Sequence, residues 1–180
     1  MFTFDTFFIN HLNIALVFPE TSHAKPLFDA INQDRDDLSR WMPWAKATQS
    51  IDDEIKFINY ARIQNAKNTL FELVIVANNQ AVGMIDLHHI SPTNKTAELG
   101  YWLASHYQGK GIISESVNRL VAFAFDQLDL HKIILQADSE NDKSIAVAQR
   151  LGFKHEGSLK DQITYQNQFK TLEVFAKFSH

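Results

Sequence analysis

The chain has 180 residues, no cysteine and a formal net charge of −4. This length suits a single domain, residues 1–180, with one sizeable core. The lack of cysteine excludes disulfides, a thiolate nucleophile and cysteine zinc sites, and the mildly acidic charge gives no electrostatic case for binding nucleic acid or an anionic membrane.

The first twelve residues are rich in phenylalanine but lack the basic region and the long apolar run of a secretory signal. We expect residues 1–12 to form an extended arm or edge strand, and the chain to be cytoplasmic. The apolar side chains of this arm could pack against a second copy, which predicts a homodimer. They are Phe2, Phe4, Phe7 and Phe8.

A short strand is expected at residues 13–18, stopped by Pro19. Thr21 or Ser22 can cap a helix that runs to about residue 38. Residues 40–44 (Arg-Trp-Met-Pro-Trp) are expected to form an aromatic loop, because a proline disfavours helix for the residue before it.

Ser50 begins a capping arrangement for the next helix, on which a stripe recurs at helical spacing. The stripe consists of Ile51, Ile55, Ile58 and Arg62. Three runs typical of strands follow, at residues 70–77, 81–90 and 96–103. Polar turns, the first at Asn78-Asn79, join them, so they predict an antiparallel meander.

The rest of the chain predicts a helix from Ile112 to about Leu128, a strand at 132–137 and a helix at 141–151 that ends at Gly152. A final strand pair is expected at residues 153–159 and 172–178. The element order predicts an α+β domain around a mixed sheet.

Residues 107–115 (Tyr-Gln-Gly-Lys-Gly-Ile-Ile-Ser-Glu) hold two of the six glycines, between a predicted strand and a predicted helix. Such a turn exposes backbone N–H groups at the positive end of a helix dipole, which favours phosphate. The Walker pattern does not fit, because Lys110 lies between the glycines. A dinucleotide pattern lacks its third glycine at Ser114. Asp138 could serve such a site by binding a ribose hydroxyl, so an NAD-binding oxidoreductase stays an alternative.

A third pattern, Gln/Arg-x-x-Gly-x-Gly/Ala, is typical of the pyrophosphate loop of acetyl-CoA-dependent N-acetyltransferases. Gln108 and Gly111 match its first two fixed positions, and Ile113 departs from the third. Together with residues 94–103 and 141–153, this turn makes the chain resemble the GNAT superfamily, and more narrowly the RimJ/RimL-type ribosomal-protein N-acetyltransferases. The resemblance spans about residues 10 to 178.

The resemblance implies a mixed, splayed sheet with the pantetheine arm of acetyl-CoA beside the third meander strand. Backbone groups of Trp102, Leu103 and Ala104 would contact that arm. The pyrophosphate would be held by Gln108, Gly109, Lys110, Gly111, Ile112, Ile113 and Ser114. Asn141 and Ser144 match the family's Asn-x-x-Ser positions, where the asparagine would reach pantetheine and the serine would protonate the leaving thiolate.

Acetyl transfer needs a group that takes a proton from the acceptor amine. Two carboxylates are candidates: Glu72, which interrupts an apolar strand, and Glu98 on the third meander strand. Trp41 and Trp44 are predicted to line the acceptor groove, with core packing as the alternative. His88 and His89 are adjacent on a strand and are expected to point to opposite faces, so we predict no metal.

These observations predict an acetyl-CoA-dependent N-acetyltransferase acting on the N-terminal amine of a peptide or ribosomal protein. Two alternatives stay open beside the oxidoreductase. The acceptor could be a small amine such as a polyamine, an amino acid or an aminoglycoside, or the chain could be a CoA-binding sensor without activity, because fold does not fix the acceptor.

Overall fold

The computed structural model describes residues 2–179. The chain forms two compact units, which are described separately. Unit 1 comprises Met1–His88 and Gly100–Val117, and unit 2 comprises His89–Leu99 and Asn118–His180. A single domain for the whole chain stays a prediction. Within the described residues, no helix is long and apolar enough to cross a membrane.

Unit 1 carries most of the helices. Its elements are β1 (Thr3–Ile9), β2 (Leu12–Val17), the 3-10 helix η1 (Thr21–His23), α1 (Ala24–Gln33), α2 (Arg35–Trp41), α3 (Trp44–Ala47), α4 (Ile51–Ala66), β3 (Phe71–Ala77) and η2 (Ser105–Tyr107). Unit 2 contains β6 (Lys132–Asp138), α6 (Asp142–Arg150), β7 (Lys154–Tyr165) and β8 (Gln168–Phe178). The boundary passes through β4 (Gln80–Ser91), β5 (Thr96–Leu103) and α5 (Ile112–Asp126).

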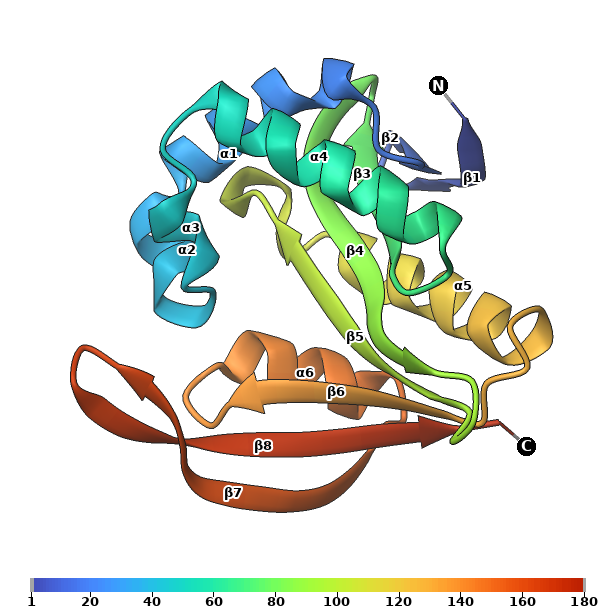
Figure 1. Cartoon of the computed structure of the whole chain (residues 1–180), viewed down its shortest axis with the longest axis vertical. Helices are drawn as coiled ribbons and strands as arrows, with labels where there is room; N and C mark the ends of the chain where they lie inside the picture. Colours follow the sequence, from blue (N-terminus) through green and yellow to red (C-terminus); the bar gives the residue numbers. More distant parts are fainter. Residues whose placement is uncertain (1, 180) are drawn as a thin grey trace. The chain divides into compact units, whose positions relative to one another are not determined.

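The strands follow the order β1-β2-β3-β4-β5-β6-β8-β7 (Figure 1). β5 and β6 are parallel and pair through three residues, Thr96 to Glu98 with Lys132 to Ile134. The pairs β1–β2, β2–β3, β3–β4, β6–β8 and β7–β8 are antiparallel. A mixed sheet that begins with a meander, continues through helix, strand and helix, and ends in a strand pair confirms the predicted α+β class.

The N-terminal segment is an edge strand, one of the two forms expected for it. β1 pairs with β2, and β2 pairs in turn with β3. Asn10 and His11 form the turn between the first two strands with φ angles of 47° and 63°. Asn78 and Asn79 form the predicted turn before β4 in the same way, with 47° and 68°. Asparagine tolerates this left-handed conformation, which two-residue hairpin turns require.

The predicted helix from Thr21 or Ser22 to residue 38 is instead divided into η1, α1 and α2. The N-cap is Glu20. Its side chain accepts the His23 backbone amide, and the His23 side chain accepts the Glu20 backbone amide. The break falls at Asp34, where φ is −106° and ψ is 17°. Asp34 Oδ1 accepts a bond from Ser105 Oγ at 2.7 Å, so a long-range contact accompanies the end of the first helix.

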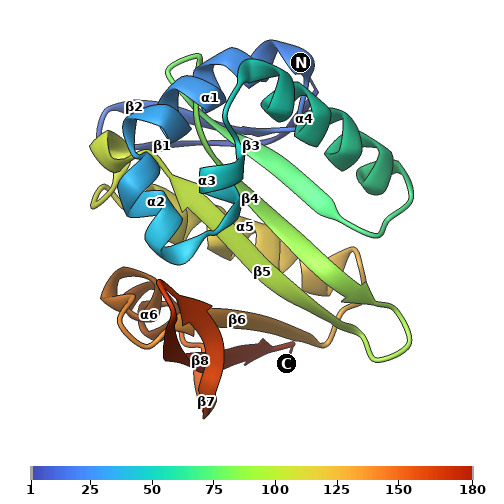
Figure 2. The same cartoon turned by 60° about the vertical axis from the view of Figure 1, so that its left-hand side comes forward.

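Helix α4 begins where Ser50 predicts, since its Oγ accepts the Asp53 amide at 3.2 Å. The predicted stripe is confirmed at Ile58, which is buried, and at Ile55, which packs against the core. It is wrong at Ile51 and Arg62, which are exposed. Glu54 and Ala61 complete the buried face, which places a carboxyl group in the interior. In Figures 1 and 2, α4 lies across the β3–β4 face of the sheet, beside α1.

The core of unit 1 lies between these helices and the strands. It comprises Val17, Ala24, Leu27, Ile31, Leu38, Ala45, Ile58, Val74, Val76, Ala81, Met84 and Trp102. Trp102 is thus a core residue, so any contact it makes with a ligand must come from its backbone.

In unit 2, β8 pairs with β6 through seven residues and with β7 along the other edge. The last two strands extend beyond the predicted 153–159 and 172–178, because the polar residues between these ranges continue the hairpin to a turn at Gln166 and Asn167. Polar exposed strands carry no hydrophobic alternation for the sequence to reveal. Helix α6 lies beside β6 and ends at Gly152, whose φ of 76° confirms the predicted cap (Figure 1).

Gly83 on β4 provides a test of this packing. A methyl group on Gly83 would lie 2.3 Å from the Trp102 carbonyl oxygen and 2.9 Å from Leu103 Cα, which are both backbone atoms. We expect Gly83→Ala to lower the free energy of unfolding by about 1–3 kcal/mol, measured by urea denaturation. Gly157→Ala on β7 is the control, because nothing lies within 4 Å of its added methyl group. Equal stability of the two variants would contradict this packing.

Candidate active site

The glycine turn has the backbone conformation that its sequence predicts. Gly109 and Gly111 have φ angles of 73° and 81°, a region that side-chain-bearing residues rarely adopt. Nothing lies within 4 Å of a methyl group built on Gly109. The turn is therefore open at this glycine, and a ligand can approach the backbone closely.

Two residues of the β1–β2 hairpin hold this turn within unit 1. The Asn10 side-chain amide donates to the Lys110 carbonyl oxygen at 2.7 Å. A methyl group on Gly111 would lie 3.0 Å from Ile9 Cδ1. No local pattern predicts this contact, because the two residues are 100 positions apart in the chain.

Helix α5 begins at Ile112, and the Glu115 amide donates to the Gly111 carbonyl at 3.0 Å. The amides of Ile112, Ile113 and Ser114 precede this first intrahelical bond and form the N-terminal donor set of the helix. Ile112 is 1% exposed, so its side chain belongs to the core. An open turn followed by such donors fits the pyrophosphate of acetyl-CoA.

Several groups beside the turn already form contacts within the protein. Gln108 Nε2 donates to the Leu103 carbonyl at 2.8 Å, which joins the turn to the end of β5. The Ala104 amide donates to the Val82 carbonyl at 2.8 Å. The Ala104 carbonyl accepts the Tyr107 amide at 2.9 Å, so both backbone groups of Ala104 are bonded within the protein. Lys110 Nζ lies 5.3 Å from the centre of the Tyr107 ring, a cation–π distance.

In unit 2, Asn141 is the N-cap of α6, and its Oδ1 accepts the Ser144 amide at 3.2 Å. Ser144 is thus the third residue of the helix and is partly exposed. Asp138, the candidate for binding a ribose hydroxyl, instead accepts the Glu140 amide at 2.8 Å and is 8% exposed. Its carboxylate stabilises the turn that leads into α6.

Glu72 is an interior carboxyl group in unit 1. It is 4% exposed, so it is not a solvent-facing edge residue. Asn65, near the end of α4, clamps its backbone: the Glu72 amide donates to Asn65 Oδ1 at 2.7 Å, and Asn65 Nδ2 donates to the Glu72 carbonyl at 3.0 Å. Desolvation, followed by the charges of Asp86 and Glu54, raises the pKa of Glu72 well above its ordinary value.

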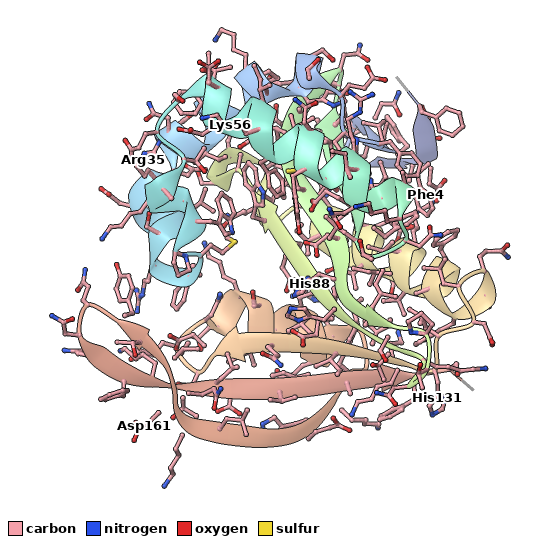
Figure 3. The ribbon with its side chains drawn as sticks, in the orientation of Figure 1. Phe4, Arg35, Lys56, His88, His131 and Asp161 are labelled. Atoms are coloured by element: carbon pink, nitrogen blue, oxygen red, sulfur yellow. The ribbon has the colours of Figure 1, made fainter. Side chains whose placement is uncertain are left out.

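Sequence reasoning missed Glu54 and Asp86. Glu54 on α4 is 3% exposed, and burial raises its pKa to about 7. Asp86 lies opposite Glu72 in the β3–β4 register, and its Oδ1 lies 2.6 Å from His88 Nδ1, on the strand where Figure 3 labels His88. The helical spacing of Glu54, Ile58 and Ala61, at i, i+4 and i+7, could have indicated from the sequence that Glu54 is buried.

The predicted loop at 40–44 is shorter than expected: Met42, which is extended before Pro43 as predicted, and Pro43 connect two helices, and both tryptophans lie on those helices. Trp41 ends α2 and Trp44 begins α3. Arg35, labelled in Figure 3, secures this connection by donating from Nη1 to the carbonyls of Ala45 and Thr48. The Trp44 ring is 39% exposed and lies 5.9 Å from that of Trp102. Trp44 therefore both contacts the core and presents an exposed edge.

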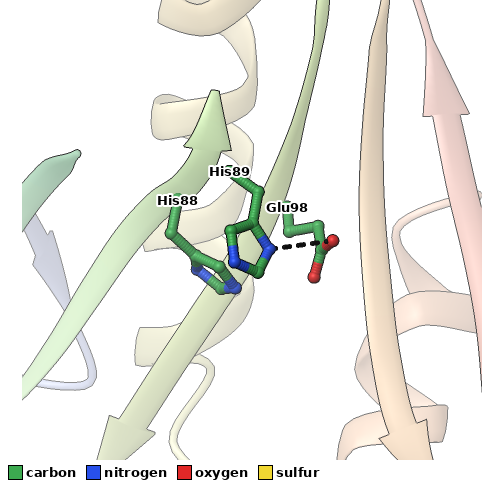
Figure 4. A group of neighbouring side chains, drawn as sticks. All are labelled: His88, His89 and Glu98. Carbon is green, nitrogen blue, oxygen red and sulfur yellow. Dashed lines mark ion pairs between the residues drawn. The ribbon is translucent and has the colours of Figure 1, made fainter. Parts of the chain in front are cut away.

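Glu98 in unit 2 pairs with a histidine. His89 Nδ1 lies 3.1 Å from Glu98 Oε1 (Figure 4). His89 has a φ of 48°, which breaks the alternation of β4, and ligand atoms of His88, His89 and Glu98 lie within 4.8 Å of one another. The expectation that the two histidines point to opposite faces is therefore wrong. The prediction that no metal is bound therefore loses this support, and it stays a prediction.

The fold and the open turn at a helix N-terminus fit one class of protein, the transferases that use a coenzyme A thioester. A model of the acetyltransferase (GNAT) domain family matches residues 13–154. The chain belongs to this family and is an N-acetyltransferase that uses acetyl-CoA.

Similar proteins carry related names. YdaF of Bacillus subtilis, named provisionally as a ribosomal N-acetyltransferase, is 34% identical over 92% of this chain and 90% of its own. The ribosomal-protein-serine acetyltransferase of Escherichia coli is 29% identical over 87% of both chains. The structure of the microcin C7 self-immunity acetyltransferase MccE with acetyl-CoA and AMP has a TM-score of 0.88, with 29% identity over 92% of both chains.

The buried Glu54 predicts an unusual pH dependence of stability. Its pKa is raised from 4.5 to about 7, so the folded state binds more protons than the unfolded state between these values, and stability falls as pH rises through this window. At pH 8 the buried charge costs about 3 kcal/mol. We expect Glu54→Gln to gain stability relative to the wild type at pH 8 but not at pH 5, measured by urea denaturation.

Asp52→Asn is the matched control for this experiment. It removes one negative charge from the same first turn of α4, but at an exposed position. Its stability relative to the wild type should change little between pH 5 and pH 8. A Glu54→Gln variant that behaves like this control would refute the raised pKa of Glu54.

Proposed function

We propose that this enzyme transfers the acetyl group to the N-terminal amine of a ribosomal protein. The observation that carries the proposal is the similarity to YdaF and to the ribosomal-protein-serine acetyltransferase over about nine tenths of the chain. The acceptor is then a protein terminus, and a free polyamine or amino acid is the competing acceptor.

In the proposed mechanism, Glu72 removes a proton from the acceptor. An N-terminal amine is largely protonated at neutral pH and must lose a proton before it can attack. The burial of Glu72 supports this role, because a carboxyl group with a raised pKa accepts protons near neutral pH. Acetyl-CoA supplies the activated thioester when bound. Ser144 is the proposed general acid, which donates a proton to the leaving thiolate.

The remaining site residues are proposed for binding. The turn from Gln108 to Ser114 would hold the pyrophosphate through its backbone, with Lys110 adding a positive charge. Trp102, Leu103, Ala104 and Asn141 are proposed for pantetheine; the Ala104 carbonyl, which accepts the Tyr107 amide, would use its second lone pair. Trp41 and Trp44 are proposed for the acceptor, and the exposed edge of Trp44 supports this. Glu98, paired with His89, is the second candidate base.

We further propose that the enzyme is a cytoplasmic homodimer. Two phenylalanines of the N-terminal segment support association, because Phe2 is 74% and Phe8 72% exposed. β1 is also the edge strand of its sheet, and such an edge presents unpaired backbone groups to a partner.

The binding role of the turn is tested by Gly111→Val. A valine at a φ of 81° is strained, and its side chain meets Ile9, so the turn must rearrange. We expect at least a tenfold weaker affinity for CoA, measured by calorimetry. Gly152→Val is the control, since it imposes the same kind of strain at a φ of 76° at the C-terminal end of α6. Unaltered CoA affinity in Gly111→Val would remove the turn from the site.

Turnover is tested with acetyl-CoA against ribosomal-protein N-terminal peptides, free amino acids, an aminoglycoside and a polyamine. We expect the peptides to give the highest kcat/KM, and a preference for any small amine would overturn the proposed acceptor.

The catalytic roles of Glu72 and Ser144 are tested by substitution. Loss of a general acid or base typically lowers kcat by about 10²–10⁴. Glu72→Gln and Ser144→Ala should each show such a loss, and unchanged kcat would refute the role of that residue.

A further inference from the structure

A hairpin that is distant in sequence reaches the middle of the glycine turn. Asn10 and His11 form the turn between β1 and β2. The Asn10 side-chain amide donates to the Lys110 carbonyl oxygen at 2.7 Å. At the start of the glycine turn, Gln108 Nε2 donates to the Leu103 carbonyl at 2.8 Å. The glycine turn is therefore held at its start by the end of β5 and at its middle by the β1–β2 hairpin.

We propose that Asn10 is a positioning residue for coenzyme A. Its side chain fixes the peptide group between Lys110 and Gly111, so that the Gly111 N–H faces the pyrophosphate. Asn10 acts through this peptide group and does not itself contact the ligand. The inference rests on the proposed role of the glycine turn in binding the pyrophosphate.

The geometry of one peptide group carries the argument. The bond between Lys110 and Gly111 is trans, and in a planar trans peptide the C=O and the N–H point in opposite directions. Because the Lys110 carbonyl points to the Asn10 side-chain amide, the Gly111 N–H points away from it. The Gly111 amide has no acceptor among residues 2–179, so it can donate to a phosphate oxygen.

The backbone on both sides of this peptide gathers further donors. Gly109 and Gly111 have φ angles of 73° and 81°, and Lys110 between them has a negative φ. Such an alternation of left-handed and right-handed residues makes successive N–H groups converge on an anion. Within the described part of the chain, the amides of residues 109 to 113 have no acceptor. The Gly111 N–H therefore belongs to a set of donors that suits a phosphate group.

Loss of the Asn10 bond would free this peptide group to turn over, because glycine at position 111 permits many backbone conformations. The Lys110 carbonyl oxygen would then face the phosphate, and its partial negative charge would repel the ligand. A ligand that binds only one of two orientations has a lower apparent affinity when both are populated. Asparagine suits position 10, since it tolerates the φ of 47° and its side chain supplies a donor.

The first test measures CoA affinity by calorimetry in Asn10→Gly, which keeps the left-handed turn and removes the donor. Asn78→Gly is the matched control. Asn78 has the same φ of 47°, and its Oδ1 accepts the Asn13 amide at 3.0 Å. We expect about three- to tenfold weaker affinity in Asn10→Gly, as for loss of one hydrogen bond, and wild-type affinity in Asn78→Gly. Unchanged affinity in Asn10→Gly, or an equal loss in both variants, would overturn the proposal.

The second test separates positioning of the pyrophosphate site from general damage to the enzyme. S-acetylpantetheine carries the same thioester as acetyl-CoA but has no pyrophosphate. In Asn10→Gly, we expect KM for acetyl-CoA to rise about three- to tenfold with kcat unchanged, while kcat/KM for S-acetylpantetheine stays at the wild-type value. Equal losses with the two donors would contradict the role of Asn10.

The outcomes of these tests are distinguishable from failure of the proposed function. Wild-type CoA affinity in Gly111→Val would overturn the role of the whole turn, and the role of Asn10 with it. Wild-type affinity in Asn10→Gly together with a loss in Gly111→Val would overturn the role of Asn10 alone. The identity of the acceptor amine does not affect the calorimetric result, because no acceptor is present in that experiment.

Discussion

The packing of α4 on β3 is the contact on which the chemistry of unit 1 depends. Ile58 and Ala61 bury one face of the helix, and Asn65 bonds both backbone groups of Glu72. The same face carries Glu54 into the interior. The helix dipole favours a negative charge in the first turn of α4 and would lower the pKa of Glu54. Desolvation acts in the opposite direction and is stronger, so the pKa of Glu54 is raised.

Burial of Glu54 at this contact has a cost in stability that depends on pH. A buried carboxyl group without a bonded partner weakens the fold as pH rises, and a valine or leucine of similar size would pack without that cost. The same desolvation makes the group able to accept a proton near neutral pH. The proposed role of Glu72 as the base would use the same effect of burial, because an amine that arrives protonated must lose a proton before it attacks.

Much of the fold could be predicted from local patterns. The Asn78-Asn79 turn, the Ser50 cap and the Gly152 cap each follow from the conformational preference of a single residue, and all three are observed. Helix boundaries between residues 21 and 47 could not be predicted. Asp34 bonds Ser105, 71 residues away, and Arg35 bonds the carbonyls around α3. No local pattern encodes such contacts.

The sequence by itself indicated the family and the cofactor, because three motifs along the chain resemble those of the family. It also predicted the glycine turn, because glycine permits the required backbone conformation locally. It also indicated Glu72, since one carboxylate in an apolar strand stands out. Only the tertiary structure decided that Glu54 is interior, that Asn10 bonds the Lys110 carbonyl, and that His89 breaks the alternation of its strand. The pKa of a side chain and the partner of a turn are set by neighbours distant in sequence, because desolvation and hydrogen bonding act through space.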